Sequence, residues 1–162
     1  MGDRVDNLVR ELALSTGLVS ATVLIHLFGL DVLQVMVRWH LDRFTTWIHL
    51  DRMLVPLGIV LGLFVLHGIE IWVYAIAYWR LDLLESLEAA LYFSTSAYST
   101  LGETGAILPV PWRIVGVLEG VNGMLLIGWS TAFLFQMLDH LMRPESEPSP
   151  HRGAIARPRR RR

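Results

Sequence analysis

Residues Thr100 to Gly105, with the sequence Thr-Leu-Gly-Glu-Thr-Gly, form a short polar segment inside an otherwise continuous hydrophobic region. The run from Ala90 to Ser99 precedes it and changes from apolar to hydroxyl-rich, as a short helix does when it enters polar surroundings. Pro109 and Pro111 follow, and a long apolar stretch begins at Trp112. Irregular backbone at membrane depth is tolerated only where it is buried in protein or lines a water-filled path. The order therefore predicts a membrane helix, a short re-entrant helix, a polar loop at a pore and another membrane helix.

Four short motifs surround this loop: Tyr92-Phe-Ser94, Ser99-Thr-Leu-Gly102, Trp112-Arg113 and Leu118-Glu-Gly120. In this order they resemble the Y-F-S of the pore helix, the T-T-V-G or T-T-L-G of the filter and the start of the inner helix in the potassium channel family. The resemblance covers roughly a third of the chain, from about Leu84 to about Leu141. It implies a homotetramer, in which four loops supply carbonyl oxygens that replace an ion's hydration shell. It also implies that potassium or another monovalent cation permeates and that no other cofactor is bound.

The resemblance implies an ion filter formed by Thr100, Leu101, Gly102, Glu103, Thr104 and Gly105. Gly102 can adopt the positive φ that inward-pointing carbonyls require. Glu103, Thr104 and Gly105, however, replace the tyrosine, second glycine and aspartate of the family. A β-branched residue is strained at positive φ, so Thr104 argues against the outer carbonyl sites, whereas the Thr100 hydroxyl and the carbonyls of residues 100–102 retain the inner ones. We expect a shortened or widened filter.

Glu103 has two interpretations. In one, four copies form a carboxylate ring around the axis, which attracts cations and favours divalent or unselective passage. In the other, Glu103 takes the tyrosine's place behind the filter and bonds to a neighbouring subunit. An anion channel is not expected in either case, because the end of the short helix and the acidic residues before it present negative potential.

Composition places the chain in the membrane class. Hydrophobic residues make up 53% and charged residues 18% of 162 residues, and cysteine is absent, so neither disulfides nor thiolate metal sites are possible. Gly128-Trp-Ser130 faintly resembles an intramembrane serine protease motif, but the second glycine is missing and no histidine partner is evident. We therefore expect no enzymatic activity, and no nucleic-acid partner.

Three long apolar stretches predict three transmembrane helices, at residues 12–30, 53–79 and about 112–141. The first has nineteen residues without a carboxylate or arginine, close to the ~20 that cross about 30 Å of hydrocarbon, and its apolar pattern continues to Trp39. The second ends in an aromatic belt of Trp72, Tyr74, Tyr78 and Trp79. Asp82 and Glu85 match a capping pattern that would start the short helix near Leu83. Gly116-x-x-x-Gly120 has the small-residue spacing that permits close helix approach.

The segment between the first two spans, residues 39–52, contains His-Leu-Asp-Arg twice, beginning at His40 and at His49. Nine residues at ~100° each put the two copies on opposite faces of one helix, so a shared metal site would need a turn between them. We expect an interfacial connector here instead of a metal site.

Charge placement divides the chain into three regions. Residues 1–52 form an N-terminal transmembrane helix and a cytoplasmic connector, residues 53–143 a pore module, and residues 144–162 a disordered basic tail. Arginines are more numerous on the side of the connector and the C-terminus, which predicts a multi-pass cell-membrane protein with its N-terminus outside. The tail either binds anionic lipid or only fixes the topology. Its terminal arginines are Arg157, Arg159, Arg160, Arg161 and Arg162.

Carboxylates within predicted spans usually face protein or water. Counted along the helices, Glu70 and Glu119 reach the depth of the short helix, so we expect them to support the filter through hydroxyls among residues 94–96. His67 lies one turn from Glu70 and would join this network, with a proton relay through both as the alternative. His26 is expected to donate a hydrogen bond between helices. The expected supporting residues of the filter are Glu70, Glu119, Tyr92 and Ser94.

The third span carries further polar and small residues. Asn122 and Ser130 or Thr131 either line a cavity or make ordinary interhelical hydrogen bonds, and Gly123 and Gly128 are the candidate hinge positions.

The sequence thus predicts an all-α integral membrane protein, with three transmembrane helices and a re-entrant pore helix per chain and four chains around one axis. The expected function is that of a cation channel subunit with potassium-channel-like permeation. The alternatives are a non-selective or divalent-sensitive cation channel, and a non-conducting membrane scaffold that keeps the pore fold.

Overall fold

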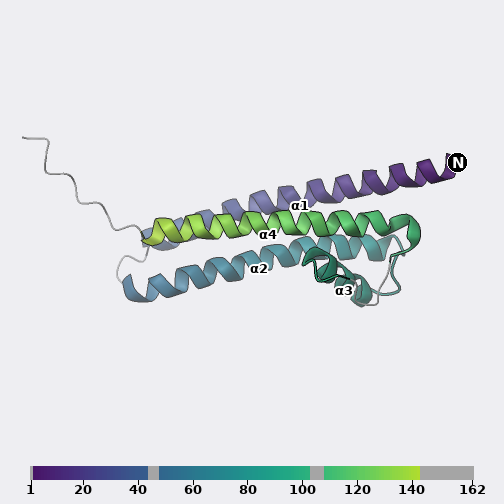
Figure 1. The fold of residues 1–162 in the computed structure, drawn as a ribbon. Coiled ribbons are helices and arrows are strands. Elements are labelled where there is room, and N and C mark those ends of the chain that lie inside the picture. The colour runs from purple at the N-terminus through teal and green to yellow at the C-terminus, as the bar shows by residue number, and fades with distance from the viewer. Residues whose placement is uncertain (1, 44–47, 103–107, 143–162) are drawn as a thin grey trace, which may run out of the picture.

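The computed structural model describes residues 2–43, 48–102 and 108–142, and the elements in these ranges are helices. Three long helices, α1 (Gly2–Arg43), α2 (Ile48–Arg80) and α4 (Arg113–Met142), lie side by side (Figure 1). The short helix α3 (Leu87–Tyr98) packs against α2 and α4 near one end of the bundle, and a single 3₁₀ turn, η1 (Val110–Trp112), leads into α4. The N-terminal turns of α1 continue past the beginning of α4.

Within the described residues, three helices have the length and composition of membrane spans, as the sequence predicts. The segments Asp6–Leu41, Met53–Arg80 and Val110–Asp139 are long and apolar enough to cross a membrane. At 1.5 Å per residue, even the 28 residues of the second extend beyond the ~30 Å of a bilayer core. Large apolar side chains are exposed along them, with Phe64 80% and Phe28 72% accessible. Such a surface suits lipid tails, and the chain is a membrane protein.

Two apolar clusters hold the bundle together. One joins the first half of α2 to the second half of α4 and to α1, with Leu30, Ile59, Leu63, Leu66 and Phe133 among its buried residues. The other joins the second half of α2 to α3, Leu108 and the start of α4, with Tyr74, Tyr78, Ala90, Leu108 and Val115. The second cluster holds α3 in place.

Helix α3 lies directly on a glycine face of α4. A Cβ atom added at Gly123 would lie 2.3 Å from the carbonyl oxygen of Tyr98, and one at Gly120 would lie 3.1 Å from that of Ala97. At Gly116 an added Cβ would meet the ring of Phe93 at 2.8 Å. The close approach predicted from Gly116 and Gly120 is therefore present, and it accommodates the short helix.

The start of α3 differs from the prediction. Ser86, not Asp82, is the N-cap, and its hydroxyl accepts a hydrogen bond from the amide of Ala89 at 3.1 Å. Asp82 instead terminates α2 with a left-handed φ of 52°. The amide of Asp82 bonds to the carbonyl of Trp79 and the amide of Leu83 to that of Tyr78, the pattern of a Schellman motif. Asp82 ends α2 and therefore cannot cap α3, which begins at Leu87, four residues later than expected.

The expected connector at residues 39–52 is largely helical. Helix α1 continues to Arg43 and α2 begins at Ile48, which leaves only residues 44–47 outside the described part of this segment. The physical reason is that no glycine or proline occurs between Leu30 and Val55, so nothing in the backbone breaks either helix. His40 and His49 consequently belong to different helices.

Candidate functional site

Each long helix places its buried polar side chains on one face. The spacings are three, four, seven or eight residues, so the side chains repeat at the helical period. These residues are Glu11, Ser15, Thr22 and His26 in α1, Glu70, Tyr74 and Tyr78 in α2, and Glu119, Asn122 and Ser130 in α4. The three polar faces meet inside the bundle, and α3 adds Ser94, Ser96 and Tyr98 to them. A polar interior thus lies within an apolar exterior.

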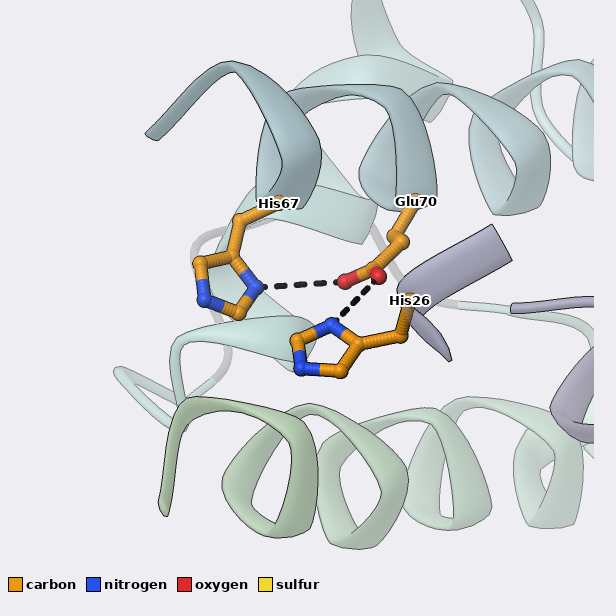
Figure 2. Close-up of side chains that lie close together, drawn as sticks. All are labelled: His26, His67 and Glu70. Carbon is orange, nitrogen blue, oxygen red and sulfur yellow. Dashed lines mark hydrogen bonds and ion pairs between the residues drawn. The ribbon is translucent and has the colours of Figure 1, made fainter. Parts of the chain in front are cut away.

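Glu70 is the centre of the first cluster in this interior. Its carboxylate is fully buried and lies 2.8 Å from Nδ1 of His26 and 3.1 Å from Nδ1 of His67. Figure 2 shows both imidazole rings, one from α1 and one from α2, turned toward the two carboxylate oxygens. The hydroxyl of Tyr98 donates a further hydrogen bond to Glu70 and lies 2.8 Å from Nδ1 of His67. One carboxylate therefore connects α1, α2 and α3.

Glu119 is the centre of a second cluster. The hydroxyl of Tyr78 donates to one carboxylate oxygen at 2.6 Å, and the hydroxyl of Ser94 lies 2.5 Å from the other. Ser94 also lies 2.9 Å from the carbonyl oxygen of Ile71. Glu119 is fully buried. This carboxylate connects α4 to α2 and α3, and the predicted contact between Glu119 and a hydroxyl of the short helix is present.

A third set of contacts closes the polar interior toward α1. The side-chain amide of Asn122 donates to the hydroxyl of Thr22 at 2.9 Å and to that of Tyr74 at 3.4 Å. The hydroxyl of Ser130 lies 3.4 Å from Nε2 of His26. Of the two roles considered for Asn122 and Ser130, the structure thus shows interhelical hydrogen bonds. Thr131 is exposed and bonds back to the carbonyl of Ile127.

Together the two carboxylates fix the orientation of α3. Ser94 and Tyr98 are four residues apart and therefore on the same face of this helix, where each reaches a different carboxylate. A buried charged or polar group is expensive to desolvate unless it is hydrogen-bonded, and at membrane depth water gives little relief. Rotation of α3 about its axis would leave both carboxylates without these donors. The interactions therefore specify one arrangement of the short helix.

The end of α3 leads into strained backbone. Thr100 has a φ of 59° and Gly102 a φ of 87°. The amides of Thr100 and Leu101 bond to the carbonyls of Ala97 and Ser96, so this end is also a Schellman motif. The predicted positive φ at Gly102 is present. A β-branched residue in the left-handed region is uncommon and costs roughly 1–2 kcal/mol, which makes Thr100 a position where strain is maintained.

Beside this end of α3 lies an open groove of about 680 Å³. Thr100 and Gly102 line it on one side and Gly116, Val117 and Val121 of α4 on the other. Leu101 is 78% exposed at the same end of α3.

The predicted site residues lie in different surroundings. Glu103, Thr104 and Gly105 fall outside the described residues. Tyr92 is 54% exposed, so the chain itself does not cover it. Gly123 is buried against Tyr98, whereas a Cβ at the exposed Gly128 would meet nothing within 4 Å.

Several members of the two clusters were not identified from the sequence. The sequence predicts Tyr74 and Tyr78 in an interfacial aromatic belt, but they are 1% and 0% exposed, whereas Trp72 and Trp79 lie at the surface. The sequence pattern does not predict that His26 and Tyr98 contact Glu70. The spacing of His67, Glu70, Tyr74 and Tyr78 at three or four residues was the available signal, because it defines one polar face.

Ser130 does have a histidine partner, contrary to the expectation from the sequence. Ser130, His26 and Glu70 form a chain in which Nε2 of the histidine faces the hydroxyl and Nδ1 the carboxylate. A serine hydrolase uses that order, and it also needs donors for an oxyanion. Ser130 lies inside α4, where backbone amides are engaged in helical bonds, and its side chain is buried. The contact is therefore assigned to the interhelical network.

One group in this interior has the composition of a metal site. One ring nitrogen each of His26 and His67 and a carboxylate oxygen of Glu70 lie within 4.8 Å of one another.

In the part of the chain that the structure describes, the protein thus has three helices of membrane-spanning length and a short helix, α3, which Glu70 and Glu119 hold in place. Comparison of the chain with protein-family models, curated proteins and solved structures finds no match. Its function is therefore inferred from the geometry.

Proposed function

We propose that this chain is one subunit of a tetrameric, potassium-channel-like cation channel. The observation that carries the proposal is the placement of α3: Glu70 and Glu119 hold it between α2 and α4, and it ends in a positive-φ segment at Thr100 and Gly102. This arrangement matches what the motifs around residues 92–102 imply, a pore helix followed by a filter loop.

The length of α3 supports a re-entrant role. Its 12 residues extend about 18 Å, too short to cross a bilayer core of about 30 Å. The segment that contains α3 starts and finishes at the same end of the bundle, because α2 ends and α4 begins there (Figure 1). The C-terminal end of a helix carries partial negative charge, which favours a cation near Thr100.

The surface beside α3 supports assembly with further copies. One loop cannot enclose an ion, so a path requires several loops around an axis. Leu101 and the groove formed with Gly116, Val117 and Val121 are open in the single chain. In the proposed tetramer, Leu101 and this groove face the neighbouring subunit or the axis.

The Thr100 hydroxyl and the carbonyls of Thr100, Leu101 and Gly102 supply the inner cation sites in this proposal. Glu103 and Thr104 replace the residues that would complete the outer sites. We therefore expect a cation-selective pore that discriminates weakly between potassium and sodium. The N-terminus lies outside and the C-terminus in the cytoplasm, where the arginine tail meets anionic lipid.

Purified protein in liposomes tests the function. Reversal potentials under opposing potassium and sodium gradients should show cation over anion selectivity with little preference between the two cations, and native mass spectrometry should show four copies. Strong potassium selectivity would contradict the expectation for the filter. A tetramer without ion flux, beside an active reference channel, would instead favour the non-conducting scaffold.

Glu103→Gln distinguishes the two positions of that carboxylate. If Glu103 forms a ring at the axis, the substitution should reduce block by calcium and by external acid, because like charges held together bind divalent ions and protons. Unchanged block in Glu103→Gln would place the side chain behind the filter.

A further inference from the structure

The side chains around Glu70 differ from an ordinary buried ion pair in their composition. Two imidazoles and one carboxylate converge from α1 and α2, and their donor atoms lie within 4.8 Å of one another. Nitrogen from imidazole together with carboxylate oxygen is a donor set that binds Zn²⁺ and neighbouring divalent metals, whereas Mg²⁺ and Ca²⁺ prefer oxygen alone. We propose that His26, His67 and Glu70 form a binding site for a divalent transition-metal ion, with Zn²⁺ as the best match.

The distances are compatible with such an ion. Zinc lies about 2.0–2.2 Å from imidazole nitrogen and carboxylate oxygen, so adjacent ligands in a tetrahedral site are roughly 3.3 Å apart. Nδ1 of His26 is 2.8 Å from one oxygen of Glu70, and Nδ1 of His67 is 3.1 Å from the other. All three donor atoms already lie within 4.8 Å of one another, so an ion needs only a small rearrangement of the three side chains to bind them together.

The contacts outside the three ligands are a second, independent observation. Ligating histidines typically donate their other ring N–H to a partner that fixes the ring, and ligating carboxylates are themselves hydrogen-bonded. Nε2 of His26 lies 3.4 Å from the hydroxyl of Ser130, and Tyr98 donates its hydroxyl proton to Glu70. These contacts orient the Nδ1 atom of His26 and the carboxylate toward the same point. A water molecule completes four ligands, as in zinc sites with three protein ligands.

Burial favours a strongly held ion. The side chains of His26 and Glu70 are fully buried, and that of His67 is 18% exposed. An ion would therefore reach the site past His67. A divalent ion replaces the protons that otherwise hold these groups together. Because its ligands come from α1 and α2, the bound ion links these helices and stabilises the bundle.

The test uses the full chain purified without a polyhistidine tag, because the tag would bind the added metal. The protein itself contains six histidines. Co²⁺ added to the metal-free protein should produce the visible absorption bands of a low-symmetry nitrogen and oxygen site, with saturation near one ion per chain. Zn²⁺ should abolish these bands and raise the temperature of unfolding. Nitrogen coupling in the electron paramagnetic resonance spectrum of bound Cu²⁺ should report imidazole ligands.

Substitutions assign the ligands. His26→Gln, His67→Gln and Glu70→Gln should each weaken Co²⁺ affinity by at least tenfold, and Ser130→Ala and Tyr98→Phe by about ten- to a hundredfold. Asn122→Ala removes a buried hydrogen bond in the same α1–α4 interface without touching a ligand, so it should retain the spectrum. Circular dichroism identifies any variant that does not fold, and in that case the Cu²⁺ spectrum of the unsubstituted protein still decides.

Two results would overturn the proposal: no Co²⁺ bands and no retained Zn²⁺ in the folded protein, or a Co²⁺ affinity in the folded His26→Gln and His67→Gln variants equal to that of the unsubstituted protein. Either would identify the cluster as a protonated hydrogen-bond network. Metal uptake is measured without ion flux, so the outcome is independent of the proposed channel function.

Discussion

At the scale of single residues, the interior is organised by two carboxylates whose partners are hydroxyl and imidazole groups. Glu70 is contacted by His26, His67 and Tyr98, and Glu119 by Tyr78 and Ser94. Hydrogen bonds to charged groups contribute about 1.5–3 kcal/mol each, and an unsatisfied buried partner costs a comparable amount. The short helix is therefore positioned by specific bonds as well as by apolar contact.

The substitution Glu119→Gln tests this at the second carboxylate. Both partners of Glu119 are hydroxyl donors, and an amide presents only one acceptor atom to them, so at least one hydrogen bond to a carboxylate is lost. Ser94 then retains only the carbonyl oxygen of Ile71 as an acceptor. We expect a loss of about 1–3 kcal/mol in unfolding free energy, measured by denaturation in detergent. Glu88→Gln, at an exposed position of α3, is the matched control and should change stability by less than about 0.5 kcal/mol. Equal effects of the two substitutions would show that the bonds of Glu119 do not hold the helix.

Backbone strain at Thr100 gives a second prediction at this scale. Glycine adopts the φ of 59° without the Cβ clash, so Thr100→Gly should stabilise the fold by about 1 kcal/mol. Thr95→Gly lies inside α3 and should destabilise it by about 0.3 kcal/mol, because glycine is a poorer helix former than threonine. Thermal unfolding of both variants measures the contrast. Loss of stability in Thr100→Gly would mean that the threonine hydroxyl contributes more than the strain costs.

At the scale of elements, α3 occupies its place because α4 presents glycine beneath it. Side chains at positions 116, 120 and 123 would push α3 away from α4, and glycine at each position avoids this. The two carboxylates can then reach Ser94 and Tyr98. The packing of α3 and its hydrogen bonds consequently depend on each other.

Alanine substitution separates a packing glycine from an open one. At Gly123 the added Cβ would meet the backbone of Tyr98 at 2.3 Å, so α3 must move and Gly123→Ala should destabilise the protein by about 1–3 kcal/mol. Gly128→Ala has open space around it and should be neutral or stabilising by up to about 1 kcal/mol. Denaturation curves provide the measurement. A hinge at Gly128 would appear separately, as altered channel opening in Gly128→Ala without loss of stability.

At the scale of the whole molecule, three helices long enough to cross a membrane surround a polar interior and expose apolar side chains. Three spans predict that the two termini lie on opposite sides of the membrane. The arginine distribution then predicts which terminus is cytoplasmic.

Cysteine labelling tests this orientation, because the natural chain contains no cysteine. In intact cells, a membrane-impermeant maleimide should label Asp6→Cys directly, whereas Glu145→Cys should react only after permeabilisation. Labelling of both positions from the same side, or the reverse pattern, would refute the predicted topology.

Three spans, a short helix between the last two and the hydroxyl contact of Glu119 are predictable from the sequence alone. Apolar content and length are local properties, so they can be read residue by residue. The contacts of His26 with Glu70 and of Thr22 with Asn122, and the inward position of Tyr74 and Tyr78, follow only from the packing of the helices. The spacing of polar residues in a membrane helix indicates one face, but it does not identify which helix packs against that face or which residues meet there. The partners of Glu70 and Asn122, 44 and 100 residues away in the chain, become adjacent only when the helices pack.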